Sequence, residues 1–225
     1  GLRLARRLHE DPHIEFCGIL AHGGHAYNQV GKMALRMVAE EERSVTVAFA
    51  KRLKQSGIPV PDISIGSTPT MSVIEDLTGI TEVRPGNYAF YDVFQATIGS
   101  CALTDIAFSV MTEVIGVYPE RGQVLIDAGA IALSKDPGLL NAQKESEFGL
   151  VYSADGHTPM SHLRLIGLSQ EHGKVKVVGH GPLPMVGERL RILPNHSCLT
   201  ASAHHSFAVM NDGKVVDTWY PIKGW

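Results

Sequence analysis

The chain has 225 residues, of which 44% are hydrophobic and 19% are charged, enough to form a buried core in one or two domains. Its formal net charge of −3 argues against a nucleic-acid partner. No stretch approaches the ~20 apolar residues of a membrane span, and no signal peptide is recognisable. Three cysteines are too few for a disulfide framework, so we expect a cytoplasmic protein in a reducing compartment.

The first residues follow a helical pattern, with Leu4 and Leu8 on one apolar face. Asp11 and Pro12 predict the end of this helix. The chain starts with Gly1 rather than methionine and opens directly inside the helical pattern. We therefore expect that an N-terminal part of the protein is missing from the sequence.

The first part of the chain alternates between strand and helix patterns. A continuous apolar run at residues 16–21 is typical of a parallel strand covered on both faces, and further strands are predicted at 62–66 and around 81–84. Helical patterns run from about residue 31 to 56 and from 72 to 77. This alternation predicts βα units around a parallel sheet.

From about Ala107 the pattern changes to short strand-like runs separated by turns. The runs lie at residues 109–118, 123–131, 149–152, 163–168, 174–178, 189–193, 207–210 and 215–220. The turns at residues 171–173 and 211–213 have the composition of hairpin connections. The second part is therefore predicted to be an antiparallel β-domain, which gives the fold class α/β plus β.

Each predicted strand of the first part is followed by a loop that contains glycine together with hydroxyl or amide groups. The loops are His22-Gly23-Gly24-His25-Ala26-Tyr27, Gly66-Ser67-Thr68-Pro69-Thr70 and Pro85-Gly86-Asn87-Tyr88. Ligands of barrels and open α/β sheets bind outside the carboxyl ends of the strands, and converging donors hold a phosphate there. Each loop alone is equally consistent with an ordinary turn or helix cap. Their occurrence after three successive strands indicates a phosphate site.

A possible metal site lies in the β-domain, in the segment Leu193-Pro194-Asn195-His196-Ser197-Cys198. In an extended segment, residues two apart point to the same face, so His196 and Cys198 can present an imidazole nitrogen and a thiolate to one ion. An isolated His-x-Cys is more often a buried cysteine beside a surface histidine. The preceding Pro194 favours a bend or edge rather than a regular core strand, and hence the metal site.

The order of these motifs resembles the D-serine dehydratase-like and D-threonine aldolase family, whose fold is of the alanine-racemase type. The resemblance runs across nearly the whole chain and is most specific in Arg-Pro-Gly-Asn-Tyr-Ala-Phe-Tyr-Asp and Pro-Asn-His-Ser-Cys. It implies that residues 1–102 are the C-terminal portion of a (β/α)8 TIM-type barrel that binds pyridoxal 5′-phosphate (PLP). It also implies that residues 103–225 are the C-terminal β-domain.

The resemblance assigns roles to six residues. The implied PLP contacts are Tyr27, Thr68, Gly86 and Asn87, the last three mainly around the phosphate, and the implied metal ligands are His196 and Cys198. The implied metal is zinc, with manganese or magnesium as alternatives. The family often has a second tyrosine seven residues before the position of Tyr27, where this chain has Leu20. The Schiff-base lysine lies on the first barrel strand of the family, so we expect it in the missing N-terminal part.

The implied activity is that of a PLP- and zinc-dependent lyase acting on D-3-hydroxy amino acids, converting D-serine to pyruvate and ammonia. The alternative within the family is a metal-dependent D-threonine aldolase, which releases glycine and an aldehyde. The expected partners are a small D-amino-acid substrate and, in the full-length protein, a second copy in a homodimer. Two further alternatives remain open: a metal hydrolase in which His22, His25 and His196 share one ion without PLP, and an inactive fragment.

Overall fold

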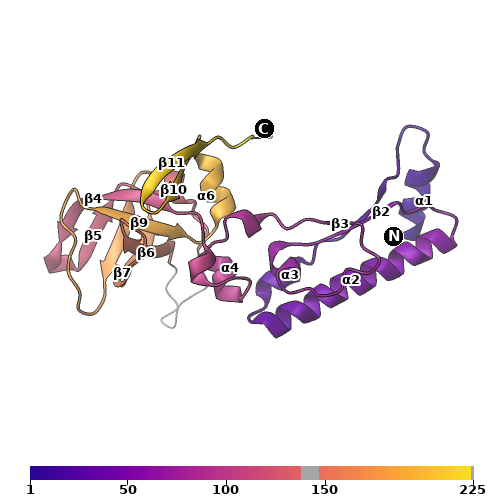
Figure 1. Ribbon diagram of the computed structural model, residues 1–225, viewed down its shortest axis with the longest axis horizontal. Coiled ribbons are helices and arrows are strands. Elements are labelled where there is room, and N and C mark those ends of the chain that lie inside the picture. Colours follow the sequence, from indigo (N-terminus) through magenta and orange to yellow (C-terminus); the bar gives the residue numbers. More distant parts are fainter. Residues whose placement is uncertain (138–146, 224–225) are drawn as a thin grey trace. The chain divides into compact units, whose positions relative to one another are not determined.

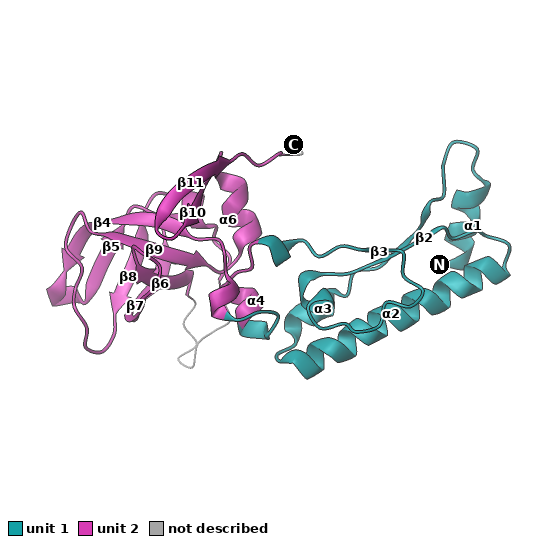
Figure 2. Ribbon diagram, viewed as in Figure 1, with its two compact units in different colours: residues 1–89, 97–102 teal, residues 90–96, 103–225 magenta. Residues whose placement is uncertain are grey.

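The computed structural model describes residues 1–137 and 147–223, which form two compact units (Figures 1 and 2). Unit 1 comprises Gly1–Ala89 and Thr97–Ala102, and unit 2 comprises Phe90–Ala96 and Leu103–Trp225. The segment 90–96 thus belongs to unit 2, although it precedes part of unit 1 in the sequence. None of the helices in the described residues has the length and hydropathy needed to cross a bilayer.

Unit 1 is built on a three-stranded sheet in the order β1-β2-β3, and both strand pairs are parallel. The strands are β1 (Gly18–Leu20), β2 (Asp62–Ile65) and β3 (Glu82–Val83), and the helices are α1 (Leu2–Glu10), α2 (Lys32–Gln55) and α3 (Thr68–Met71). Ile19 lies opposite Ile63, and Ser64 lies opposite Glu82. The predicted parallel α/β arrangement of the first part is confirmed.

The long helix α2 packs against β1 and β2 through one face. Its buried residues recur every three or four positions, as an amphipathic helix requires: Leu35, Val38, Ala39, Glu42, Thr46, Ala50 and Leu53. Gly57, with a φ of 80°, follows the last turn, and the Ile58 N–H donates to the Leu53 carbonyl. This glycine ends α2 at the position that the sequence predicts.

The helix predicted at residues 72–77 is wrong, because the turn of helix comes earlier in the chain. The Ser67 hydroxyl accepts the Thr70 N–H at 3.4 Å, the Thr70 hydroxyl accepts the Ser67 N–H at 3.2 Å, and Pro69 occupies the first turn. This reciprocal capping box starts α3 at Thr68, directly after the loop that follows β2. Residues 74–77 have no regular structure.

Unit 2 is a closed six-stranded barrel in the order β4-β5-β8-β7-β6-β9, and every strand pair in it is antiparallel. Its strands are β4 (Val110–Tyr118), β5 (Gln123–Ile126), β6 (Gly149–Ser153), β7 (Pro159–Leu168), β8 (Gly173–Val177) and β9 (Arg189–Pro194). A separate hairpin pairs β10 (Phe207–Asn211) with β11 (Lys214–Trp219). The predicted antiparallel β-domain is confirmed, and both hairpin turns join antiparallel neighbours.

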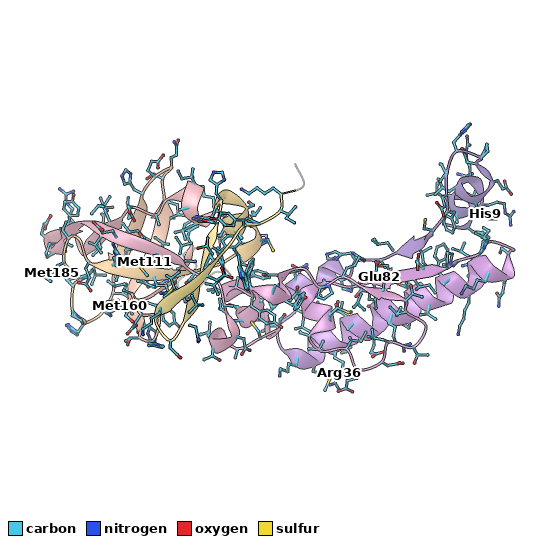
Figure 3. The ribbon with its side chains drawn as sticks, turned by 45° about the horizontal axis from the view of Figure 1, so that its top comes forward. His9, Arg36, Glu82, Met111, Met160 and Met185 are labelled. Carbon is cyan, nitrogen blue, oxygen red and sulfur yellow. The ribbon has the colours of Figure 1, made fainter. Side chains whose placement is uncertain are left out.

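The barrel encloses one hydrophobic core because its strands alternate between inward and outward side chains. On β4, Val110, Thr112 and Val114 are buried, whereas Met111 points outward and is 47% exposed (Figure 3). The other strands contribute the fully buried residues Val124, Ile126, Leu165, Val175, Leu190 and Ile192. Burial of these side chains supplies the main favourable free energy of folding for this unit.

Three short helices have no counterpart among the predicted helices: α4 (Val93–Ile98, divided between units 2 and 1), α5 (Ala130–Leu133) and α6 (Ser197–Ala203). The strand predicted at residues 123–131 is wrong beyond Ile126. A Cβ at Gly129 would collide with the backbone of residues 170–172, so the chain turns there and α5 begins. The residues that the structure describes also contain the short 3-10 turns η1 (Gly24–Asn28), η2 (Asn87–Ala89), η3 (Leu103–Asp105) and η4 (Pro119–Arg121).

Candidate functional site

The carboxyl ends of β1, β2 and β3 carry the three loops in which the predicted cofactor contacts lie. Tyr27 is in η1 after β1, Thr68 is the first residue of α3 after β2, and Asn87 is the first residue of η2 after β3. Because parallel strands end at the same edge of a sheet, unit 1 holds all three loops at one edge.

The structure brings two of the four predicted PLP contacts into direct contact. The Asn87 N–H donates to the Thr68 hydroxyl at 2.8 Å, and the two residues are 8% and 2% exposed. As acceptor in this bond, the Thr68 hydroxyl retains its own proton to donate to a ligand. The loops after β2 and β3 therefore form one structure, with a hydroxyl and backbone N–H groups at its centre.

Gly86 lies beside this pair and is exposed. A Cβ built on it would meet no atom within 4 Å, so the fold does not require a glycine there. The open space instead lets a ligand approach the backbone closely, as a phosphate bound by N–H groups does. The residues of this loop therefore fit a phosphate group.

The loop after β1 is joined to the loop after β2 through His22. The Nδ1 atom of His22 lies 3.0 Å from the Gly66 carbonyl oxygen, and its ring lies 6.2 Å from the ring of Tyr27. His25 faces a different group, since its Nε2 lies 3.8 Å from Glu41. The two histidines of this loop thus have separate partners, and the hydrolase that would use both on one ion remains a prediction.

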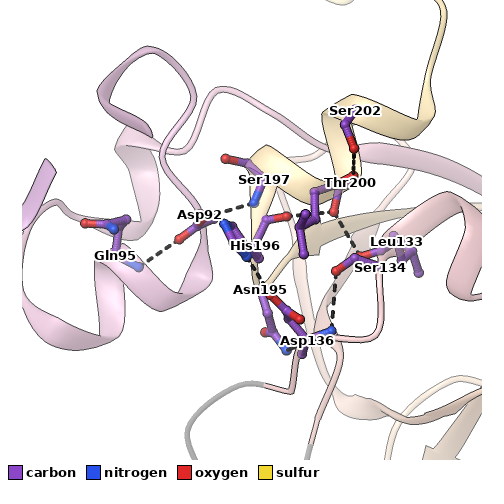
Figure 4. A network of polar contacts seen from close by, with 11 residues as sticks. Asp92, Gln95, Leu133, Ser134, Asp136, Asn195, His196, Ser197, Thr200 and Ser202 are labelled. Atoms are coloured by element: carbon purple, nitrogen blue, oxygen red, sulfur yellow. Dashed lines mark hydrogen bonds and ion pairs between the residues drawn. The ribbon is translucent and has the colours of Figure 1, made fainter. Parts of the chain in front are cut away.

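The predicted metal pair lies at the start of α6, in unit 2, and Figure 4 shows His196 with its surroundings. His196 is the N-cap residue with extended backbone, and Cys198 is in the first helical turn. The prediction that both residues belong to one extended segment is therefore wrong for Cys198. The helix begins here because the Asp92 carboxylate accepts the Ser197 N–H, which no residue inside the helix can accept.

The His196 ring lies between a sulfur and a carboxylate. Its Nδ1 lies 2.6 Å from Oδ2 of Asp136, and its other polar contact is the side chain of Cys198. The hydrogen bond to Cys198 raises the pKa of His196 to about 9, the Asp136 carboxylate adds to this rise, and burial opposes it. In the metal-free protein the imidazole is therefore protonated at neutral pH.

Two further side chains fix the backbone that carries the pair. Asp92, which is 1% exposed, accepts the Ser197 N–H at 3.0 Å and the Gln95 N–H at 2.8 Å. The Asn195 amide donates to the carbonyls of Glu147 and Asp136 at 2.6 and 3.1 Å. The peptide N–H after His196 and the side chain of the residue before it are thus both held by hydrogen bonds (Figure 4). Neither Asp92 nor Asp136 follows from the sequence, because each is distant in the chain from the residue that it contacts.

The donor pair of an imidazole and a cysteine sulfur fits zinc. With Nδ1 facing Asp136, the Nε2 atom is the ring nitrogen left for a metal, as in many sites where a carboxylate orients a histidine ligand. Within the described residues, no three His, Cys, Asp or Glu side chains are grouped as a metal cluster. Cys198 also lines a cavity of about 580 Å³ with aromatic walls that include Phe207 and Trp219.

The described residues thus combine an α/β unit that carries three glycine-containing loops at one sheet edge with a β-barrel unit that carries a His-Cys pair. A family model described as "Putative serine dehydratase domain" matches residues 107–210. D-serine dehydratase from Dictyostelium discoideum is 37% identical over 95% of this chain and 55% of its own length. D-threo-3-hydroxyaspartate dehydratase from Delftia sp. HT23 is 37% identical, with a TM-score of 0.89 over all of this chain and 60% of that one.

The chain belongs to the D-serine dehydratase, D-threo-3-hydroxyaspartate dehydratase and D-threonine aldolase family, which is alanine-racemase-like. It spans 55–60% of the length of the relatives just named. A D-threonine aldolase from Arthrobacter is 27% identical over 97% of the chain. Two solved variants of D-threo-3-hydroxyaspartate dehydratase replace a histidine and a cysteine by alanine, at positions two apart, and the cysteine variant is in a metal-free form.

Proposed function

We propose that this chain supplies the cofactor-phosphate loops and the metal pair of a PLP- and zinc-dependent lyase that converts D-serine to pyruvate and ammonia. In this proposal, residues 1–102 are the C-terminal portion of a PLP-binding (β/α)8 barrel, and residues 103–225 are the β-domain. The observation that carries the proposal is His196 and Cys198 at the start of α6, with Asp136 behind the histidine. The chain spans only part of its relatives, so the reaction is proposed for the protein as its gene encodes it.

The comparison with the D-threo-3-hydroxyaspartate dehydratase variants supports the metal pair. The residues replaced there are a histidine and a cysteine with the spacing of His196 and Cys198 here. When bound, zinc supplies a Lewis acid that turns the β-hydroxyl of the substrate into a leaving group. Cys198 contributes negative charge to the ion, and Asp136 holds the His196 ring in place.

The loop cluster of unit 1 supports the PLP assignment. PLP supplies an electron sink for the reacting amino acid when it is bound. The Thr68 hydroxyl and the backbone beside Gly86 and Asn87 bind the phosphate, and Tyr27 contacts the cofactor from the loop after β1. These groups are neutral, and hydroxyl and backbone N–H donors can hold a phosphate without a cationic side chain.

Dehydration is favoured over aldol cleavage by the relatives. The two dehydratases are 37% identical to this chain, whereas the D-threonine aldolase from Arthrobacter is 27% identical. The cavity beside Cys198 gives a small substrate access to the metal. D-threo-3-hydroxyaspartate is the competing substrate, because its dehydratase is as similar to the chain as D-serine dehydratase is.

The first test is zinc binding by the 225-residue chain, measured by equilibrium dialysis and by the thiolate charge-transfer band of the cobalt-substituted protein. His196→Ala and Cys198→Ser are expected to abolish binding, and Cys198→Ser is expected to abolish the band. His205→Ala and Cys17→Ser replace an exposed residue of the same type and are the matched controls. Binding that survives both ligand variants would refute the metal pair.

The second test is activity of the protein as its gene encodes it. D-serine, D-threo-3-hydroxyaspartate and D-threonine are supplied separately, and pyruvate, oxaloacetate and glycine are measured. We expect pyruvate from D-serine, a loss of that activity with EDTA and its return with zinc. Glycine from D-threonine as the main product would replace the dehydratase assignment with the aldolase. Turnover that is indifferent to EDTA would remove zinc from the mechanism.

Gly86 provides a test of the phosphate loop with little cost to the fold. Gly86→Ala adds a methyl group where no atom lies within 4 Å, so the melting temperature is expected to stay close to that of the parent chain. The methyl group occupies the proposed phosphate space, and the affinity for PLP is expected to fall about tenfold or more. Equal PLP affinity in the two proteins would place the phosphate elsewhere.

A further inference from the structure

A buried carboxylate lies beneath the loops that follow β1 and β2. Glu42, in the middle of α2, is only 6% exposed. One of its oxygens, Oε1, accepts the Gly23 N–H at 2.7 Å and the Gly66 N–H at 3.2 Å. A single side chain from the helix therefore joins the backbones of two loops that are separated by about forty residues of sequence.

The loop after β1 is shaped to admit this carboxylate. A Cβ at Gly23 would lie 3.2 Å from Cδ of Glu42 and 3.3 Å from its Oε2, tighter than ordinary packing. The φ of Gly23 is −74°, which any residue can adopt. The glycine is therefore needed for the space that it leaves to Glu42 and not for its backbone conformation.

The contact is too specific to be explained as filling of the core. The Oε2 atom of Glu42 is buried and has no hydrogen-bond partner among the described residues. A carboxylate in such a place loses solvation, and a leucine of similar size would fill the space without that loss. What the carboxylate provides, and an apolar side chain does not, is an acceptor shared by the N–H groups of both loops.

We propose that Glu42 is a positioning residue that sets the loop carrying Tyr27 against the loop carrying Thr68. The proposal rests on the proposed function for its consequence, since these loops hold the cofactor there. His22 also joins these two loops, but it contacts the carbonyl of Gly66 through its Nδ1 atom, whereas Glu42 accepts the N–H of Gly66. Both backbone polar groups of Gly66 therefore have side-chain partners.

The test compares Glu42→Gln, which keeps an acceptor oxygen, with Glu42→Leu, which keeps similar volume and removes it. Lys51→Gln, on the exposed face of the same helix, is the control. Hydrogen–deuterium exchange of the 225-residue chain is followed by mass spectrometry on peptides that contain Gly23 and Gly66. Glu42→Leu is expected to speed exchange there about tenfold or more, Glu42→Gln much less, and Lys51→Gln not at all. The barrel strands of unit 2 serve as the internal reference.

The Gly23→Ala variant approaches the same contact from the loop side. Its methyl group displaces the carboxylate, so exchange is expected to rise at Gly23 and Gly66 while α2 stays protected. Unchanged exchange in both Glu42→Leu and Gly23→Ala would overturn the proposal. The proposal would also be overturned if exchange in Glu42→Leu rose evenly throughout unit 1 while exchange in Gly23→Ala matched that of the parent chain.

Titration with PLP separates this proposal from the proposed function. If Glu42 positions cofactor loops, Glu42→Leu weakens PLP binding about tenfold, and Glu42→Gln restores most of the affinity. If the parent chain shows the expected exchange but binds no PLP, Glu42 still positions the two loops and the cofactor assignment fails. If PLP binds the parent chain and Glu42→Leu with equal affinity, the positioning role is refuted and the cofactor assignment stands.

Discussion

The two units differ in whether their β-sheets have edge strands with unpaired backbone groups. In unit 2 the strands close on themselves, since β4 pairs with both β5 and β9, and one core lies inside the barrel. In unit 1 the three strands form an open sheet in which β1 and β3 are the edges within the described residues. Apolar side chains such as Leu20 of β1, at 66%, are exposed there. A barrel satisfies its own backbone, whereas an open parallel sheet depends on further chain to cover it.

This difference between a closed barrel and an open sheet indicates which contacts hold each half of the candidate site in place. The metal pair starts a helix anchored on a closed barrel, with Asp92 and Asn195 holding its backbone. The phosphate loops follow strands of only two to four residues, so they depend on contacts with one another: Thr68 with Asn87, and Glu42 with Gly23. We therefore expect the metal half to be robust when isolated and the phosphate half to be sensitive to single substitutions.

The largest expected effect comes from separating the units. A polypeptide of residues 90–225 contains the whole barrel core and is expected to fold and to melt cooperatively. A polypeptide of residues 1–102 is expected to aggregate, because its sheet edges and apolar helix faces are exposed. Circular dichroism melts and analytical ultracentrifugation measure both. A 1–102 polypeptide that is monomeric and melts cooperatively would contradict the claim that unit 1 is less able than unit 2 to fold alone.

Core substitutions measure the same contrast at single residues. Leu165 is fully buried in the barrel, and Leu165→Ala is expected to lower the free energy of unfolding by about 2–5 kcal/mol. Leu20→Ser removes an exposed leucine from β1 and is expected to cost less than about 0.5 kcal/mol. Urea titrations of the 225-residue chain give both values. Equal costs would mean that Leu20 is covered in solution.

Asp136 allows the metal half to be weakened without removing a ligand. Asp136→Asn retains a hydrogen-bond partner for Nδ1 of His196 and removes the charge, so zinc affinity is expected to fall about ten- to hundredfold. Competition with a chelator of known affinity measures the change. Asp155→Asn, at an exposed turn of the same unit, is the control and is expected to leave zinc affinity unchanged. An unchanged affinity in Asp136→Asn would show that Asp136 does not orient the ligand.

The smallest expected effect is the pH dependence of the metal-free protein. The folded-state pKa of His196 is raised from 6.5 to about 9, chiefly by the hydrogen bond to Cys198. The stabilisation from this group is therefore fully present below pH 6.5 and is lost as the pH rises through 9. The side chain is 41% exposed, so only a modest decrease in melting temperature is expected over this range. In His196→Asn the melting temperature is expected to change less between pH 6.5 and 9. An equal change in the variant and the parent chain would show that His196 is not the group responsible.

The sequence alone determined the order and kind of the main elements. Strand–helix alternation and the later series of turns predicted the parallel sheet and the antiparallel barrel, because periodicity reports which faces are buried. The motifs that follow the strands predicted the positions of Thr68 and Asn87, since strands of a parallel sheet end at one edge. The family followed from the same motifs.

Tertiary structure alone decided which side chains hold these loops and the metal pair. Asp136 lies 60 residues from His196, Asp92 lies 105 from Ser197, and Glu42 lies 19 from Gly23. Asp136 and Glu42 lie outside the motifs, and Asp92 ends the Arg-Pro-Gly-Asn-Tyr-Ala-Phe-Tyr-Asp motif, but the partner of each carboxylate depends on long-range packing that local propensity does not encode. The start of α6 at His196 was decided in the same way, because the N–H that opens the helix is accepted by Asp92 from another part of the chain.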